Sequence, residues 1–205
     1  MTTHNSSSTR ERLIDATVSL MRVKGAAATG TKEIMDLAGA PRGSFYYHFP
    51  DGKDELVLAA LERAAAATLL SLTEPLTDGA GNLGQQVRTI FTAIETDLVA
   101  NDYAPGCAVA VTTVESASTF THFQQAVSAM FTTWTSALTS RLSQRGLSPD
   151  RAAALSDAIV SATEGATILA RAHRSPTPLR NAALILELAI NAVVRESPDN
   201  NNSTA

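Results

Sequence analysis

A short stretch near the start of the chain gathers side chains that can hydrogen-bond to phosphates and to base edges. Residues 29–56 read TGTKEIMDLAGAPRGSFYYHFPDGKDEL. Arginine and lysine bind phosphate oxygens, and hydroxyl and imidazole groups add hydrogen bonds to the nucleic-acid backbone or to bases. The candidate DNA contacts are Thr29, Thr31, Lys32, Arg42, Gly43, Ser44, Tyr46, Tyr47, His48 and Lys53.

Two short helices on either side of a glycine turn would position these side chains. The spacing of apolar residues predicts one helix over residues 31–38 and a second over residues 41–49, with Gly39 in the turn between them. Thr29 is the expected N-cap of the first helix. Lys53 opens the next helix, where it can approach a phosphate.

The second short helix should present two adjacent tyrosines. Successive helical residues point about 100° apart, so Tyr46 and Tyr47 cannot both pack inward beside the phenylalanines, and at least one must be exposed. The side chains expected to face the core of this small head are Ile34, Leu37, Phe45 and Phe49.

Each of these residues alone has a simpler explanation. A tyrosine on a helix is often half-buried packing, a histidine is often structural, and Lys53 or Arg42 would serve as a solvated surface charge. Only the joint placement of these residues favours DNA binding.

The rest of the chain has helical periodicity and almost no strand pattern, which predicts an all-α fold of about nine helices. Proline at the first helical position supports the helix starts at Pro105, Pro149 and Pro178. The predicted helices cover residues 9–24, 31–38, 41–49, 53–74, 83–100, 105–115, 119–145, 149–173 and 178–195.

Composition limits the class of protein. The chain has 205 residues, 44% of them apolar, and a net charge of -4, so it lacks the basic excess of a protein that coats nucleic acid. A single cysteine, Cys107, allows no internal disulfide and no cysteine zinc cluster, and we expect no metal or cofactor. The polar start and the lack of a run of roughly 18 apolar residues predict a cytoplasmic protein that does not enter a membrane.

The head closely resembles the DNA-binding domain of TetR-type regulators. The matching residues, in family order, are Gly39, Arg42-Gly43, Tyr46-Tyr47-His48-Phe49 and Lys53-Asp54-Glu55-Leu56. The stretches Phe49-Pro50-Asp51-Gly52-Lys53 and Pro105-Gly106-Cys107-Ala108-Val109-Ala110 resemble the branch that includes the LmrA and YxaF repressors. The chain departs from the family pattern at Ala40 and Pro41, so no base preference carries over.

The resemblance implies a helix-turn-helix domain over residues 9–56 and a ligand-binding and dimerisation domain over residues 57–196. The polar composition of the two ends predicts disordered tails at 1–8 and 197–205. The resemblance also implies a homodimer formed by the last two helices, whose apolar faces are wide. Packing on the rest of the body is the alternative. The expected interface residues are Leu155, Ile159, Ala162, Ala166, Leu184, Ile185 and Leu188.

Aromatic residues cluster in the middle of the chain and could line an apolar pocket for a small effector. An aromatic stripe at helical spacing is also typical of plain core, Cys107 of a small buried hydrophobe, and Glu164 of an interface hydrogen bond. The expected ligand contacts are Phe91, Tyr103, Cys107, Phe123, Met130, Phe131, Trp134 and Glu164.

These patterns together predict a dimeric repressor that an effector releases from operator DNA. An all-α enzyme is the first alternative, and the chain contains no HExxH, nucleophile elbow or phosphate loop to support it, so we expect no catalysis. A helical interaction module without DNA binding is the second, which the acidic charge allows and the head residues argue against.

Overall fold

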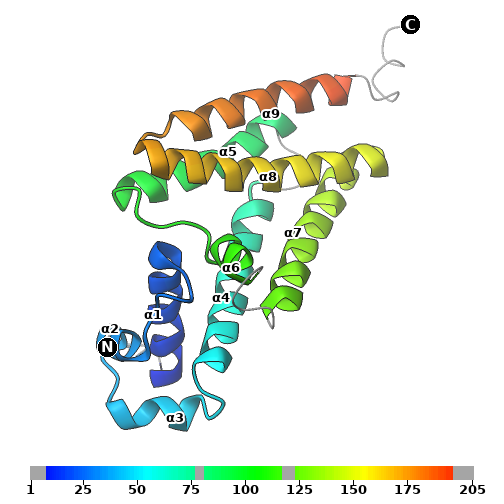
Figure 1. Cartoon of the computed structure of the whole chain (residues 1–205). Coiled ribbons are helices and arrows are strands. Elements are labelled where there is room, and N and C mark those ends of the chain that lie inside the picture. The colour runs from blue at the N-terminus through cyan, green and yellow to red at the C-terminus, as the bar shows by residue number, and fades with distance from the viewer. Residues whose placement is uncertain (1–7, 77–80, 117–122, 196–205) are drawn as a thin grey trace, which may run out of the picture. The chain divides into compact units, whose positions relative to one another are not determined.

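The structure is a computed structural model that describes residues 8–76, 81–116 and 123–195 (Figure 1). Within these ranges the chain forms nine α-helices and one 3-10 helix, η1, and no strand, which confirms the predicted all-α class. The elements are α1 (Thr9–Lys24), α2 (Thr31–Ala38), η1 (Arg42–Ser44), α3 (Phe45–His48), α4 (Lys53–Thr73), α5 (Leu83–Ala100), α6 (Ala108–Ser116), α7 (Gln124–Gln144), α8 (Pro149–His173) and α9 (Thr177–Arg195). The predicted tails lie outside the described residues, apart from Ser8.

Most predicted helix bounds agree with the structure, and α2, α5 and α8 match at both ends. The predicted helix start at Pro105 is wrong, because α6 begins three residues later, at Ala108. The backbone N–H of Gly106 instead donates to the carbonyl of Arg22, 2.7 Å away. This backbone is used for a tertiary contact before the helix starts.

The chain divides into two compact units. Unit 1 comprises Met1–Ala66 and Pro105–Met130, and unit 2 comprises Ala67–Ala104 and Phe131–Ala205. The N-terminal head thus groups with α6, which follows it in the chain by some forty residues.

Helix α1 is delimited by local signals. The Ser8 hydroxyl oxygen accepts a hydrogen bond from the backbone N–H of Glu11, at 3.2 Å, as an N-cap does. The helix ends at Gly25, whose φ of +82° suits glycine. The largest fully buried side chains of this unit are Leu13, Met21, Ile34, Phe49, Phe123, Leu56 and Leu61.

Polar contacts hold α1 to its neighbours in unit 1. The Arg12 Nε donates to the carbonyl of Ala38, 3.0 Å away, and so satisfies the end of α2. Arg63 on α4 pairs with the carboxylates of Glu11 and Asp15 on α1. Its hydrogen bond to Glu11 is the main reason that the pKa of Arg63 is raised above its ordinary value.

In unit 2, α9 packs along α5 and α8 (Figure 1). A side chain at Gly84 of α5 would meet the Glu187 carbonyl of α9 at 2.8 Å, so glycine allows the two helices to approach closely. Arg180 hydrogen-bonds to Glu95 across the same pair, at 3.0 Å from Nε, and this bond raises the pKa of Arg180. The buried residues of α9 are Leu179, Ala183, Leu186 and Ile190, at helical spacing.

Two helices, α4 and α9, are long and apolar enough to cross a membrane when judged by length and composition. This is weak evidence, because core helices of soluble proteins pass the same test.

Candidate nucleic-acid interface

A glycine turn separates α2 from the next helical segment. Gly39 has φ +58°, in the left-handed region that glycine tolerates, and the N–H of Ala40 donates to the Met35 carbonyl at 3.0 Å. The chain re-enters helix at Pro41, whose carbonyl accepts from both the N–H and the hydroxyl of Ser44, at 2.9 and 2.7 Å.

The second short helix is divided into η1 and α3, where a single helix over residues 41–49 was predicted. We call residues 42–48 the recognition element. The predicted inward packing of Phe45 and Phe49 is confirmed, since both are buried with ring centroids 6.2 Å apart. The inward prediction for Leu37 is wrong, because this side chain is 56% exposed. Ile34 is buried as predicted, and Ala38, four residues later, shares its buried face of α2.

Two tyrosines are the most exposed large side chains among the described side chains of the recognition element. Tyr46 is 70% and Tyr47 is 82% exposed, so both, and not just one, point away from the head core. Edge-to-face ring contacts hold them: Phe45 to Tyr46 at 5.0 Å and Tyr47 to His48 at 4.9 Å. Their rings are thereby oriented without being covered.

Small or polar residues accompany the tyrosines. Gly43 is exposed, and a Cβ there would touch nothing within 4 Å. Ser44 and His48 are half-buried. The side chain of Arg42 lies outside the described part of the chain.

Helix α2 contributes an exposed cation and a half-buried hydroxyl at its start, Lys32 and Thr31. Lys24 of α1 forms an ion pair with Glu33, which neutralises one nearby positive charge. The N-terminal turn of α2 also has backbone N–H groups without helical partners, which favour an anion.

The prediction that Thr29 caps α2 is wrong. The N-cap is Gly30, and Thr29 is fully buried with its hydroxyl donating to the Gly25 carbonyl, 2.6 Å away. This burial also leaves the Thr29 side chain unable to contact DNA directly. Its role is to close the turn between α1 and α2.

Lys53 is the first residue of α4, as predicted, but its ammonium group already has a partner. The Nζ donates to the carbonyl of Ala26 at 2.8 Å, and the side chain is half-buried. A phosphate would have to share or replace this contact.

Two contacts of the head had no local sequence signal. The guanidinium of Arg10 lies 5.2 Å from the centroid of the Phe49 ring. The Glu115 carboxylate of α6 accepts from the N–H groups of Ala26 and Ala27. Residues 88 or 89 positions apart carry no periodicity that would reveal their contact.

The eight expected ligand contacts are divided between the two units. Unit 1 contains Cys107, Phe123 and Met130, and unit 2 contains Phe91, Tyr103, Phe131, Trp134 and Glu164. Phe91, Phe123 and Trp134 are fully buried, as plain core residues are. Phe131 and Trp134 contact each other edge to face, with centroids 5.0 Å apart.

The expected dimer residues lie on α8 and α9 with different exposures. Leu184, Ile185 and Leu188 of α9 are exposed. Ile159 and Ala166 of α8 are buried within the chain, so their side chains present little surface to a partner. Leu155 and Ala162 are half-buried.

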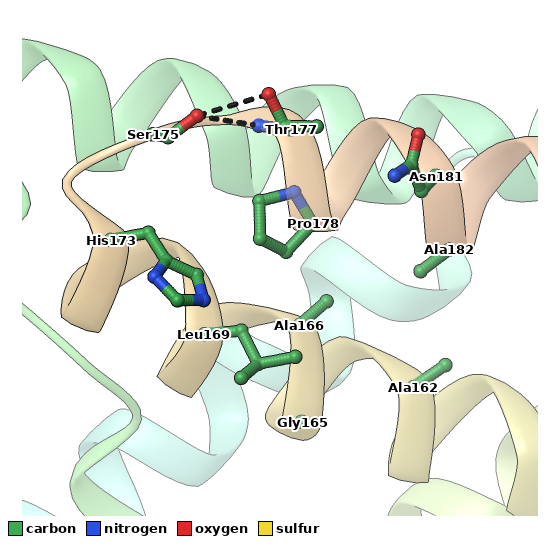
Figure 2. A pocket seen from close by; sticks show the side chains of 10 residues that line it. All are labelled: Ala162, Gly165, Ala166, Leu169, His173, Ser175, Thr177, Pro178, Asn181 and Ala182. Atoms are coloured by element: carbon green, nitrogen blue, oxygen red, sulfur yellow. Dashed lines mark hydrogen bonds between the residues drawn. The ribbon is translucent and has the colours of Figure 1, made fainter.

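An open groove of about 550 Å³ runs between α8 and α9 (Figure 2). Figure 2 shows Leu169 and His173 of α8 on one side and Pro178 and Asn181 of α9 on the other. None of the eight expected ligand contacts is among its described lining residues. Two expected dimer residues, Ala162 and Ala166, do line it.

Two helices, a glycine turn and a short exposed element at the start of an all-helical chain define a helix-turn-helix DNA-binding protein. A family profile described as "Bacterial regulatory proteins, tetR family" matches residues 13–60. A second, described as "Transcriptional regulator LmrA/YxaF-like, C-terminal domain", matches residues 84–184. The chain belongs to the TetR family of transcriptional regulators, in its LmrA/YxaF-like branch, which confirms the resemblance predicted from the sequence.

Relatives extend over most of the chain. A helix-turn-helix-type transcriptional regulator of Mycobacterium tuberculosis is 31% identical over 175 residues, covering 83% of this chain and 88% of the relative. The regulator LmrA of Bacillus subtilis is 26% identical over 173 residues, covering 83% and 90%.

Solved structures share the fold. The regulatory protein TetR from Rhodobacter sphaeroides superposes with a TM-score of 0.80 at 24% identity, covering 89% of this chain and 98% of that one. The reduced form of Escherichia coli NemR superposes with a TM-score of 0.71 at 26% identity, covering 87% and 95%. TetR-family regulators bind operator DNA and typically dimerise.

Proposed function

We propose that this TetR-family regulator is a cytoplasmic repressor whose recognition element enters the major groove of operator DNA. The exposure of both Tyr46 and Tyr47 carries the proposal, because a short element that holds two oriented rings away from its own core suits a groove surface. Tyrosine hydroxyls donate to phosphates or base edges, and the rings contact thymine methyl groups.

Residues around the tyrosines have distinct proposed roles. Lys32 and Thr31 contact the phosphate backbone from α2, as the first helix of this motif does. Gly43 and Ser44 let the recognition element approach closely, His48 adds a hydrogen bond, and Arg42 and Lys53 bind a base or phosphate. The name of NemR, a repressor that is 31% identical over 107 residues covering 52% of this chain, supports the repressor role.

The proposed homodimer uses the face formed by α8 and α9. Ile185 and Leu188 continue the α9 surface that borders the groove, since Ile185 follows Asn181 by four residues and Leu188 follows Ile185 by three. A second copy would cover this apolar area, including Leu184 and Leu169. Two heads placed about 34–36 Å apart would then meet successive turns of the major groove.

In the proposed function, a small, largely apolar effector bound in the C-terminal domain releases the protein from DNA. The eight expected ligand contacts remain the proposed contacts, and those that are half-buried and so have accessible surface are Tyr103, Cys107, Met130, Phe131 and Glu164. The effector would favour a dimer whose two recognition elements no longer match adjacent grooves.

Selection from a pool of random-sequence DNA duplexes tests the DNA-binding part directly. The full-length protein should enrich a pseudo-palindrome whose half-sites are separated by one helical turn, and the variant with Tyr46→Ala and Tyr47→Ala should enrich the same duplex more weakly. Failure of the wild-type protein to enrich any duplex at low salt would favour the interaction module.

A further inference from the structure

The turn between α1 and α2 is held by side chains from two other helices. Glu115, in the last turn of α6, accepts from the N–H of Ala26 at 3.0 Å and from the N–H of Ala27 at 3.4 Å. Lys53, the first residue of α4, donates to the carbonyl of Ala26 at 2.8 Å. The Thr29 hydroxyl closes the same turn on the Gly25 carbonyl.

Opposite charges therefore bracket the backbone of one residue, Ala26. Its N–H points at a carboxylate and its carbonyl at an ammonium group. Hydrogen bonds to charged partners are stronger than neutral ones, and Ala26 is buried, so water competes weakly for these groups. Gly25 makes room for this arrangement, because a Cβ there would collide with the Glu115 carboxylate.

The segment that carries Glu115 is also fixed to α1 at its opposite end. The N–H of Gly106 donates to the carbonyl of Arg22 at 2.7 Å, and the Nε of Arg22 donates back to the carbonyl of Gly106 at 3.1 Å. Attachment before α6 and again in its last turn gives Glu115 a defined position relative to α1. Both attachments lie within unit 1.

We propose that Glu115 is a positioning residue for DNA binding, acting through the α1–α2 turn. Helix α2 begins at Thr31, just after this turn, so the Ala26 contacts fix where α2 starts and where the Lys53 ammonium lies. The inference rests on the proposed use of α2 and the recognition element to bind DNA. The DNA-binding surface then depends on a carboxylate that does not itself contact DNA.

Simple electrostatics gives the opposite expectation. Glu115 adds a negative charge to the DNA-binding unit, so its neutralisation should strengthen attraction to phosphates. A positioning role requires that the same substitution weaken binding. The sign of the effect therefore separates the two explanations.

The experiment compares full-length Glu115→Ala and Glu115→Gln with wild type, using a fluorescein-labelled duplex that the wild-type protein selects from a random pool. Glu115→Ala should bind about tenfold more weakly, because two N–H groups lose a charged acceptor. Glu115→Gln keeps an amide oxygen that can accept, and should fall between the two. The slope of log Kd against log salt should stay at the wild-type value, since no phosphate contact is removed.

Glu62→Gln is the matched control, because Glu62 is an exposed carboxylate on α4 of the same unit. The Glu62→Gln variant loses the same charge, and should bind the selected duplex as tightly as wild type or slightly more tightly. Glu115→Gln that binds as tightly as Glu62→Gln would overturn the proposal. So would a lowered salt slope in Glu115→Gln, which would indicate lost contact with phosphate.

Amide hydrogen exchange tests the turn without DNA. Glu115→Gln should speed exchange at Ala26 and Ala27 and leave the amides of α5, α8 and α9 at wild-type rates. Unchanged exchange at Ala26 and Ala27 contradicts the positioning role even if DNA binding changes. Failure of the wild-type protein to select a duplex would count against the proposed function, while the exchange result would still decide the role of Glu115 in the turn.

Discussion

Two exposed surfaces of this regulator differ in chemistry. The recognition element presents Tyr46 and Tyr47, aromatic rings with polar edges on a very short helix. The α8–α9 face presents Ile185 and Leu188, aliphatic side chains of the long helix α9. The recognition element suits a charged partner that forms hydrogen bonds, and the α8–α9 face suits an apolar protein surface. Salt should distinguish them, because phosphate binding weakens with salt and apolar association does not.

The largest effect should come from a charge on the aliphatic face. Ile185 is 64% exposed, and in the proposed dimer Ile185→Glu would bury a carboxylate without a partner. The dimer dissociation constant should rise at least about a hundredfold, as expected for an unpaired buried charge. Sedimentation equilibrium measures this constant at two salt concentrations.

Val99→Asp is the control for Ile185→Glu. Val99 is an exposed apolar residue of α5 in the same unit, outside the α8–α9 face. This variant should dimerise as wild type does. A Val99→Asp variant that is monomeric, or an Ile185→Glu variant that stays fully dimeric, would indicate that the interface does not lie on α9.

The next effect concerns the tyrosines. Replacing Tyr46 and Tyr47 together by alanine should weaken binding to the selected duplex by about thirtyfold, because two base contacts, each at the lower end of the usual range of about 1–3 kcal/mol, contribute about 2 kcal/mol together. The free energy of unfolding should change by less than about 0.5 kcal/mol per site, since both side chains are exposed. Fluorescence anisotropy and urea unfolding measure the two quantities.

Phenylalanine at both positions separates the rings from their hydroxyls. Wild-type affinity in the double phenylalanine variant would assign the contact to the rings, and alanine-like affinity would assign it to the hydroxyls. A large loss of folding stability in the alanine variant would instead indicate that the tyrosines support the head core.

The smallest effect is expected at Lys32. If this exposed lysine binds one phosphate, Lys32→Ala should weaken all duplexes alike, by about fivefold, and lower the salt slope by about 0.9. Lys24→Ala is the control, because Lys24 already pairs with Glu33. Equal slopes for Lys32→Ala and wild type would place α2 away from the DNA backbone.

Helix positions could be predicted from the sequence because their signals are local. Apolar spacing together with Gly39 and Pro149 located the ends of α2 and the start of α8. The start of α6 could not be located, since Pro105 is typical of a first helical residue. Its neighbour Gly106 is bound to Arg22, which lies 84 residues earlier.

Helical spacing predicted the inward-facing side chains of the head except Leu37, but contacts formed by turns or by distant residues could not be predicted. The facing of Phe45 and Phe49 followed from their spacing. Thr29 has the residue type of an N-cap, but the turn buries it against Gly25. The role of Glu115 could not be predicted, because nothing near it in the sequence indicates the Ala26 and Ala27 amides.

The discontinuity of unit 1 limits how this head can be transplanted. A chimaera that carries only residues 1–66 omits Gly106 and Glu115, and leaves the buried Ala26 amide without its acceptor. A graft that also supplies residues 105–130 retains both contacts. For gene fusion, the exchangeable module is therefore two separate stretches of coding sequence, and a cut made straight after the helix-turn-helix motif would divide it.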